Sequence, residues 1–277
     1  ISPEMVVDRV KEADIVIFAG GISPSLEGEE MYSVNSPGFA GGDRTSIELP
    51  QVQRDILKAL KKAGKKVVFV NCSGSAVALV PEMESCDAIL QAWYPGQSGG
   101  LAVADVLFGD FNPSGKLPVT FYKNTDQLPD FEDYSMKNRT YRYMTEVPLF
   151  PFGYGLSYTT FDISKGRLNK KTISAGQDLN FKVNVKNTGK YDGAEVIQVY
   201  VRKVDDAEGP IKSLRAFRRV PLKAGETCVV SIDLLPTTFE FFDPTTNTMR
   251  IMPGKYEIMY GNSSDIPSGN KLSVTLR

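Results

Sequence analysis

The chain has 277 residues, of which 42% are hydrophobic and 23% are charged, a composition typical of a globular protein rather than of a disordered or fibrous one. Its 32 lysines and arginines nearly balance its 33 aspartates and glutamates, so no excess of positive charge exists to neutralise phosphates, and we expect no nucleic-acid partner. Histidine is absent, which excludes a Ser-His-Asp triad, a Cys-His dyad and a histidine-based zinc site within this chain.

The first half of the chain alternates segments typical of strands with segments typical of helices. Short apolar runs at 13–21, 66–74 and 87–96 predict strands, and we expect the first of them to be buried on both faces of a parallel sheet. Apolar residues at helical spacing predict helices within 49–66 and 99–110. This alternation predicts a layered α/β sandwich domain with a mostly parallel sheet and functional loops at the carboxyl ends of the strands.

Helical spacing does not return in the second half. A polar and aromatic stretch without a clear period begins near residue 121 and predicts a long ordered connector. After it, period-two runs bounded by turn residues predict antiparallel strands, at 178–189, 194–203, 227–235 and 254–264. We therefore expect an α/β sandwich domain at 1–122, an interdomain connector at 123–160 and an all-β, fibronectin type III-like sandwich at 161–277.

Motifs that would indicate a cofactor fail on their spacing. The segment "GDFNPSGK" at 109–116 is similar to a phosphate-binding loop, but its spacing is one residue too long, and Leu117 stands where Ser or Thr should hold magnesium. No GxGxxG follows the first predicted strand. The three cysteines, Cys72, Cys86 and Cys228, lie far apart without a CxxC spacing, which favours free thiols. We expect no cofactor and no metal site.

The segment "GGISPSLEGEEM" at 20–31 follows the first predicted strand and carries three acids, Glu27, Glu29 and Glu30. Without histidine or a metal-ligand cluster, carboxylates are the groups left for acid–base chemistry, and an α/β fold usually displays such groups in the loops after its strands. From composition alone, a solvated acidic loop is the better explanation, and evidence from beyond the loop is needed to reverse that order.

Five segments, read together and in order, resemble the C-terminal part of an enzyme of glycoside hydrolase family 3. They are "GGISPSLEGEEM", "GGDRTSIELPQVQRDILKAL", "AWYPGQSGGLAVADVLFGDFNPSGKLPVTF", "YRYMTEVPLFPFGYGLSYTTF" and "VKNTGKYDGAEVIQVYV". The resemblance covers essentially the whole chain, and the blocks "GDFNPSGKLP" and "PLFPFGYGLSYT" are highly specific.

The resemblance implies a three-part enzyme, in which a (β/α)8 barrel precedes an α/β sandwich domain and a fibronectin type III-like domain. Members are exo-acting β-glucosidases, β-xylosidases and relatives, with an aspartate nucleophile on the barrel and usually a glutamate acid/base on the α/β domain. This chain matches the second and third parts only. The resemblance therefore implies that it supplies the acid/base for a β-linked oligosaccharide or glycoside substrate, depends on the missing barrel and is inactive alone.

The resemblance also assigns roles to residues in the acidic loop. Glu27 matches the general acid/base, which is the first acid of a Glu-x-Glu pair that precedes an x-DR-x-S/T segment. Asp43 and Arg44 supply that "DR", Glu29 is the runner-up for the acid/base, and Glu30 ranks behind it. We expect Asp43 and Arg44 to form a buried pair near the site that holds the base of the loop, since guanidinium and carboxylate pair bidentately.

Trp93 and Tyr94 lie at the end of the third predicted strand. An aromatic plane at this place is a candidate to bind substrate by stacking on a sugar, and we name Trp93 for this role, although a lone tryptophan equally fits an interface or a core. The β-sandwich carries no obvious acid cluster or aromatic strip, so we expect it to be a scaffold.

Two functions from different classes remain open. The chain is either the acid/base half of a retaining β-glycosidase or a non-catalytic carbohydrate-binding or interaction module that has kept the fold. The family's sugar pocket lies mostly on the barrel, so the choice between glucose, xylose and other sugars cannot be made from this chain. No apolar run approaches the ~20 residues that span a bilayer. The family implies a periplasmic or secreted protein, although the first residues show no signal peptide.

Overall fold

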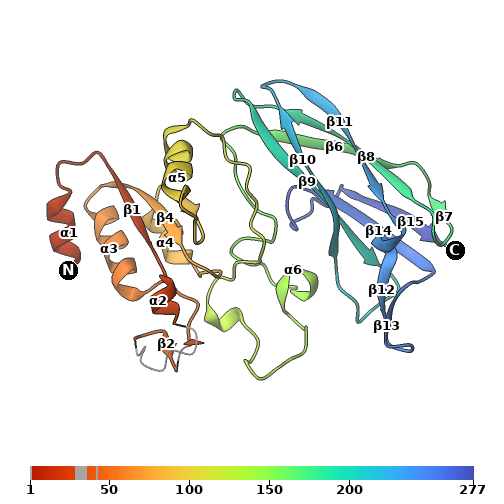
Figure 1. Ribbon diagram of the computed structural model, residues 1–277, viewed down its shortest axis with the longest axis horizontal. Coiled ribbons are helices and arrows are strands. Elements are labelled where there is room, and N and C mark those ends of the chain that lie inside the picture. Colours follow the sequence, from red (N-terminus) through yellow and green to blue (C-terminus); the bar gives the residue numbers. More distant parts are fainter. Residues whose placement is uncertain (1, 29–35, 42) are drawn as a thin grey trace. The chain divides into compact units, whose positions relative to one another are not determined.

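The computed structural model describes residues 2–28, 36–41 and 43–277 (Figure 1). Contacts divide the chain into two compact units. Unit 1 comprises Ile1–Phe108, Phe121–Tyr134 and Pro148–Phe150, and unit 2 comprises Gly109–Thr120, Ser135–Val147 and Pro151–Arg277. The units therefore interleave along the chain, and residues 109–120 and much of the predicted connector belong to the unit that contains the β-sandwich. In the part of the chain that the structure describes, no helix is long and apolar enough to cross a membrane.

Unit 1 is an α/β domain built on a parallel sheet with the strand order β1-β4-β5. The strands are β1 (Ile15–Gly21), β4 (Lys66–Cys72) and β5 (Ala88–Gln91). The helices are α1 (Pro3–Arg9), α2 (Pro24–Glu27), α3 (Gln51–Lys62), α4 (Val80–Ser85) and α5 (Gly99–Phe108), with a 3-10 turn η1 (Thr125–Gln127) and two short strands, β2 (Phe39–Ala40) and β3 (Asp43–Arg44). The fold class, the three strands and the two helices predicted from the sequence are confirmed.

Helix α3 illustrates how the apolar spacing produces the core of unit 1. Leu57 and Leu60 are fully buried and pack in one cluster with Val67 and Phe69 of β4. Lysines occupy the last turn, where they complement the negative end of the helix dipole, and Gly64 follows with a left-handed φ of 75°. A full set of local signals therefore specifies this helix.

The expectation that the first strand is buried on both faces is wrong. β1 is an edge strand of its sheet, and Ile15 and Ile17 on one of its faces are 56% and 51% exposed. Val16 and Phe18 on the other face pack against the core cluster. The apolar run therefore marks a strand of which one face packs on the core cluster and the other is exposed.

Unit 2 contains a β-sandwich with one five-stranded sheet in the order β10-β9-β14-β15-β7 and one three-stranded sheet in the order β11-β8-β6. Strands β12 and β13 form a separate hairpin. The strands are β6 (Phe161–Leu168), β7 (Thr172–Ile173), β8 (Leu179–Asn187), β9 (Gly193–Lys203), β10 (Ser213–Leu222), β11 (Thr227–Leu234), β12 (Glu240–Asp243), β13 (Thr248–Ile251), β14 (Gly254–Gly261) and β15 (Lys271–Leu276). The core cluster includes Val183 and Val185 of β8 and Val199 and Val201 of β9, all fully buried, so alternate residues of the two sheets face each other, as the period-two pattern predicts. The remaining elements of this unit are α6 (Thr140–Tyr143) and η2 (Pro236–Phe239).

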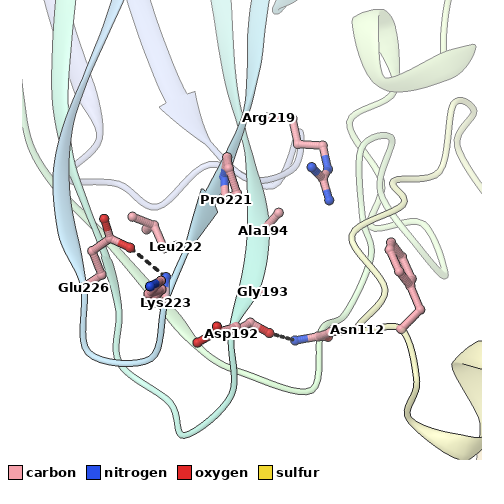
Figure 2. A pocket seen from close by; sticks show the side chains of 10 residues that line it. Asn112, Asp192, Gly193, Ala194, Arg219, Pro221, Leu222, Lys223 and Glu226 are labelled. Atoms are coloured by element: carbon pink, nitrogen blue, oxygen red, sulfur yellow. Dashed lines mark hydrogen bonds between the residues drawn. The ribbon is translucent and has the colours of Figure 1, made fainter.

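A pocket on unit 2 lies where Asn112 meets the turns at the end of the sandwich (Figure 2). Several of its polar groups form hydrogen bonds within these turns. Asn112 donates its Nδ2–H to the carbonyl of Asp192 at 2.9 Å, and the Glu226 carboxylate accepts a hydrogen bond from the backbone N–H of Lys223 at 2.7 Å. None of the site residues predicted from the sequence lines this pocket.

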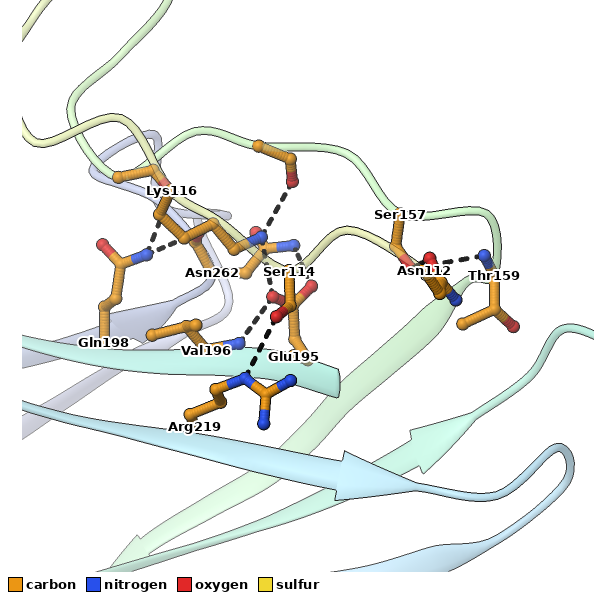
Figure 3. A network of polar contacts seen from close by, with 12 residues as sticks. Asn112, Ser114, Lys116, Ser157, Thr159, Glu195, Val196, Gln198, Arg219 and Asn262 are labelled. Carbon is orange, nitrogen blue, oxygen red and sulfur yellow. Dashed lines mark hydrogen bonds and ion pairs between the residues drawn. The ribbon is translucent and has the colours of Figure 1, made fainter. Parts of the chain in front are cut away.

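A buried polar network joins residues 109–120 to the sandwich (Figure 3). Lys116 forms an ion pair with Glu195 of β9, with Nζ and Oε1 2.7 Å apart, and also donates to the carbonyl of Gly155 at 2.8 Å. The second oxygen of Glu195 accepts from Asn262 Nδ2 at 2.9 Å. The block "GDFNPSGKLP" is therefore held in unit 2 by charge and hydrogen bonds.

Candidate active site

The carboxyl ends of the three parallel strands in unit 1 bring three side chains together. Glu27 follows β1 through the short helix α2, Ser75 follows β4, and Tyr94 follows β5. Because parallel strands end at the same edge of a sheet, residues far apart in the sequence meet at this edge. The site therefore lies where sequence analysis expects the functional loops of an α/β domain.

One helical turn fixes the backbone of Glu27. Ser23 caps α2 by accepting a hydrogen bond on its hydroxyl from Leu26 N at 3.2 Å, and Glu27 N donates to the Ser23 carbonyl at 2.9 Å. Gly28 follows in the left-handed conformation, with φ 55°, and ends the turn. The Glu27 side chain is half-buried, so its carboxylate is held and still accessible.

Hydroxyl groups contact both oxygens of the Glu27 carboxylate. Tyr94 Oη lies 2.7 Å from Glu27 Oε2, and Ser75 Oγ lies 3.0 Å from Glu27 Oε1. Arg44 forms no ion pair with this carboxylate but donates its Nη1–H to Ser75 Oγ at 2.9 Å. The positive charge of Arg44 therefore acts on Glu27 through an intervening hydroxyl.

Tyr94 packs tightly between Glu27 and the loop after β4. A Cβ atom added at Gly74 would lie 2.6 Å from Tyr94 Cε2 and 3.0 Å from Glu27 Oε2, so only glycine leaves space for both side chains. Burial, followed by the hydrogen bond to Glu27 and the charge of Glu27, raises the pKa of Tyr94 to about 12. Its phenol is therefore protonated and can donate at neutral pH.

Arg44 links the site to the loop after β4 but does not pair with Asp43. Besides Ser75, its guanidinium donates to the carbonyls of Ala76 and Ser46, both at 3.2 Å. Burial lowers the pKa of Arg44, and the charge of Glu27 opposes that shift. Asp43 is exposed, so the expected buried Asp43–Arg44 pair is wrong, because neighbouring residues of the short strand β3 point to opposite faces.

A second glutamate, Glu48, holds the segment that follows Arg44. Its carboxylate accepts hydrogen bonds from the Ser46 hydroxyl, from Thr125 Oγ1 at 2.6 Å and from Thr125 N at 2.9 Å. Burial alone would raise the pKa of Glu48, but these hydrogen bonds outweigh it and lower the pKa to about 2. Glu48 is therefore fixed in its ionised form.

Buried amides position the loop that carries Ser75. Asn71, fully buried in β4, donates to Gln91 Oε1 of β5 at 2.6 Å, and Gln91 Nε2 donates to Ser73 Oγ at 3.1 Å. Ser73 in turn donates to the carbonyl of Ser75 at 2.8 Å. The sequence patterns did not reveal this network or the roles of Ser75 and Gly74, although the position of these residues directly after a strand is a signal that could have found them.

Of the remaining predicted site residues, the structure describes Trp93 but neither Glu29 nor Glu30. Trp93 is half-buried, with a left-handed φ of 57°, and its ring meets that of the buried Phe121 edge to face at 6.0 Å. This contact accounts for Trp93 as a packing residue of unit 1, and sugar stacking by Trp93 stays a prediction. Glu29 and Glu30 lie outside the described residues.

Comparison with known proteins shows which family the chain is similar to. A model of the glycosyl hydrolase family 3 C-terminal domain matches residues 2–158, and a model of the fibronectin type III-like domain matches residues 195–264. A xylan 1,4-beta-xylosidase of Xylanibacter ruminicola is 61% identical over 270 residues, which are 98% of this chain and 31% of that protein. A periplasmic beta-glucosidase of Salmonella typhimurium is 38% identical, over 95% of this chain and 35% of that protein.

Solved structures show the same likeness. A β-glucosidase from Erythrobacter marinus matches 99% of this chain and 36% of its own, with a TM-score of 0.84 at 33% identity. The family 3 β-glucosidase of Bifidobacterium adolescentis matches 99% of this chain and 40% of its own, with a TM-score of 0.83 at 31% identity. The chain spans 31% and 35% of the two sequence relatives, about a third of their length.

Proposed function

This chain belongs to glycosyl hydrolase family 3, and we propose that it is the C-terminal part of a retaining, exo-acting β-glycosidase with Glu27 as the general acid/base. The substrates are terminal β-linked glucosides or xylosides, as the names of the relatives suggest. The aspartate nucleophile lies on a (β/α)8 barrel outside this chain, so the chain alone is inactive. A periplasmic relative supports an exported protein.

The observation that carries this proposal is the placement of the Glu27 carboxylate. It is half-buried at the carboxyl edge of the sheet, and each of its oxygens contacts a hydroxyl group, Tyr94 on one side and Ser75 on the other. A hydroxyl that is free to turn suits a carboxyl group that gains and loses a proton, because it can donate to the carboxylate and accept from the carboxylic acid.

The reaction requires Glu27 in both protonation states. In the first step the acid gives its proton to the glycosidic oxygen, which keeps the electron pair of its bond to the anomeric carbon, and the nucleophile bonds to that carbon. In the second step the Glu27 carboxylate takes a proton from a water whose oxygen bonds to the anomeric carbon and displaces the nucleophile. Glu27 ends the cycle protonated, as it began.

The test is a Glu27→Ala variant of the longer protein that contains this chain. An unactivated disaccharide needs the acid, so its kcat/KM is expected to fall by roughly 10²–10⁴-fold. An aryl β-glycoside with an activated leaving group should keep most of its kcat/KM, because its leaving group departs without a proton. Azide should accelerate turnover of the activated substrate and yield a β-glycosyl azide, because a small anion needs no general base.

Glu29→Ala is the matched control, since Glu29 is the runner-up in the same loop. Its kinetic constants are expected to stay close to those of the unchanged protein. Equal, small losses on both substrates in Glu27→Ala would overturn the assignment. A chain that binds glycans weakly and keeps that binding in Glu27→Ala would instead support a non-catalytic carbohydrate-binding module.

A further inference from the structure

The Tyr94 hydroxyl has two acceptors and one proton to give. Its Oη lies 2.7 Å from Glu27 Oε2 and 2.8 Å from the carbonyl oxygen of Ile22, the first residue after β1. A carbonyl oxygen only accepts, and an ionised carboxylate only accepts, so with ionised Glu27 one of the two contacts lacks a proton. With protonated Glu27 this conflict disappears, because Glu27 Oε2 can then donate its own proton to Tyr94 Oη while Tyr94 donates to the Ile22 carbonyl.

Ser75 has no such choice. Its Oγ accepts the Nη1–H of Arg44 at 2.9 Å, and a guanidinium cannot accept in return, so the Ser75 proton is directed to Glu27 Oε1 at 3.0 Å. Of the two oxygens of a protonated carboxyl group, the carbonyl oxygen is the stronger acceptor, so the oxygen that accepts from Ser75 is best left unprotonated. The proton of the neutral acid is therefore assigned to Oε2, the oxygen next to Tyr94.

We propose that Tyr94 is a positioning residue whose hydroxyl changes acceptor as Glu27 loses and regains its proton, an inference that rests on the proposed function of Glu27. While Glu27 is neutral, the Tyr94 proton is donated to the Ile22 carbonyl. As the Glu27 proton passes to the leaving-group oxygen, Tyr94 turns its proton to Oε2 and stabilises the new carboxylate. When Glu27 takes a proton from water, Tyr94 returns to Ile22, so Tyr94 never gives up its own proton.

The hydrogen bond from Tyr94 strengthens where negative charge develops. A hydrogen bond to a carboxylate is roughly twice as strong as one between neutral groups, and a donor that is already in place needs little reorganisation at the moment of reaction. The rise in the Tyr94 pKa is consistent with this geometry, since the phenol stays protonated next to a charged Glu27. Tyr94 thus acts in the steps in which Glu27 changes charge.

Tyr94→Phe in the longer protein tests the proposal, because it removes the hydroxyl and keeps the ring against Gly74. We expect kcat/KM for the unactivated disaccharide to fall roughly ten- to a hundred-fold, the loss of one hydrogen bond to a charged group. For the activated aryl β-glycoside, kcat/KM should change by less than about three-fold, because its first step needs no proton from Glu27. A merely structural defect would lower both values equally.

Two further variants separate the possible failures. Tyr191→Phe alters an exposed tyrosine in unit 2 and serves as the matched control, with both substrates unchanged. In a Glu27→Ala background, Tyr94→Phe should add no further loss on the disaccharide. If Glu27→Ala shows the selective loss and Tyr94→Phe behaves like Tyr191→Phe, the inference about Tyr94 is overturned and the proposed function stands. If Glu27→Ala shows no selective loss, the proposed function fails first.

Discussion

Glu27 in unit 1 and Glu195 in unit 2 are both held by several hydrogen bonds, but their partners differ in kind. Glu195 is 4% exposed, pairs with the Lys116 ammonium and accepts the N–H groups of Asn262 and Val196. Glu27 is half-buried and contacts two hydroxyls, and no cation in the described part of the chain is within ion-pair distance of its carboxylate. N–H groups and ammonium groups can only donate, so the surroundings of Glu195 permit one charge state, whereas those of Glu27 permit two.

The difference indicates what distinguishes a structural carboxylate from a candidate catalytic one in this molecule. The number of hydrogen bonds does not separate them, since both glutamates are well connected. The chemistry of the donors does. A carboxylate surrounded by fixed donors joins segments of the chain, and one contacted by a hydroxyl that is free to turn, as Glu27 is by Tyr94, can exchange a proton at little cost in hydrogen bonding.

The largest expected effect concerns the structural carboxylate. Lys116→Ala leaves Glu195 buried without its cation, and we expect the free energy of unfolding of this chain to fall by about 3–5 kcal/mol. Urea unfolding followed by far-ultraviolet circular dichroism, which reports the sheets of unit 2, measures the change.

Two matched variants show whether the charge is responsible. Lys190→Ala removes an exposed lysine from the same unit and should change the unfolding free energy by less than about 0.5 kcal/mol. Glu195→Gln in the Lys116→Ala background should recover part of the loss, because no buried charge is then left unpaired. If Lys116→Ala and Lys190→Ala unfold at the same urea concentration, the ion pair contributes nothing to stability. Glu195 would then not be a structural carboxylate that contrasts with Glu27.

A smaller effect is expected from crowding the candidate catalytic carboxylate. Gly74→Ala places a methyl group 2.6 Å from Tyr94 Cε2 and 3.0 Å from Glu27 Oε2, so the two side chains must move apart. Displacing a catalytic group by a fraction of an ångström to about 1 Å costs up to roughly a hundred-fold in rate, and in the longer protein that contains this chain we expect a loss of about ten- to a hundred-fold in kcat/KM on the disaccharide. The activated aryl β-glycoside should be affected much less.

Gly96→Ala is the control for this prediction. A Cβ atom at Gly96 meets no atom within 4 Å, and its backbone is not in the left-handed region, so the same change in residue type is made without crowding. Equal activity of Gly74→Ala and Gly96→Ala on the disaccharide would mean that the close packing of Tyr94 against Glu27 has no kinetic role.

How far these features could be predicted follows from the range of the interactions that create them. Helix α3 and strand β4 depend on apolar spacing within a few residues, and both were predicted within a few residues of their bounds. Glu27 was selected from the resemblance of its segment to a family, which is also local. Its partners Ser75 and Tyr94 lie 48 and 67 residues further along the chain, and only the strand order β1-β4-β5 brings them to it.

The predictions that failed have the same origin. An apolar run cannot reveal whether one face of a sheet or both are covered, so Ile15 and Ile17 were expected to be buried. The "DR" dipeptide suggested a pair between Asp43 and Arg44, but adjacent residues in a strand face opposite sides. Arg44 instead forms hydrogen bonds with Ser75 and Ala76, which lie 31 and 32 residues further along the chain. The interleaving of the two units likewise depends on contacts such as that between Lys116 and Glu195, which no local sequence pattern predicts.

The smallest expected effect comes from Glu48, which extends the comparison to a third carboxylate. Like Glu27 it contacts hydroxyls, but the Ser46 hydroxyl accepts a hydrogen bond from Glu48 N and the Thr125 hydroxyl accepts one from Ile47 N, so both are committed to donating to the carboxylate. Hydroxyls without a free choice should behave as fixed donors do. This accounts for the lowering of the Glu48 pKa from 4.5 to about 2.

A depressed pKa in the folded chain contributes stability that is present above the unfolded value, near 4.5, and is lost as the pH falls toward about 2. Glu48→Gln removes this contribution, so the difference in unfolding free energy between the unchanged chain and the variant should be constant above pH 5.5 and shrink between pH 4.5 and about 2. Urea unfolding at a series of pH values measures it, with the exposed Glu84→Gln as the control. A difference that stays constant down to pH 3 would show that committed hydroxyls do not fix the charge of Glu48, and the distinction drawn between Glu195 and Glu27 would then rest on the ion pair with Lys116 rather than on the freedom of the donors.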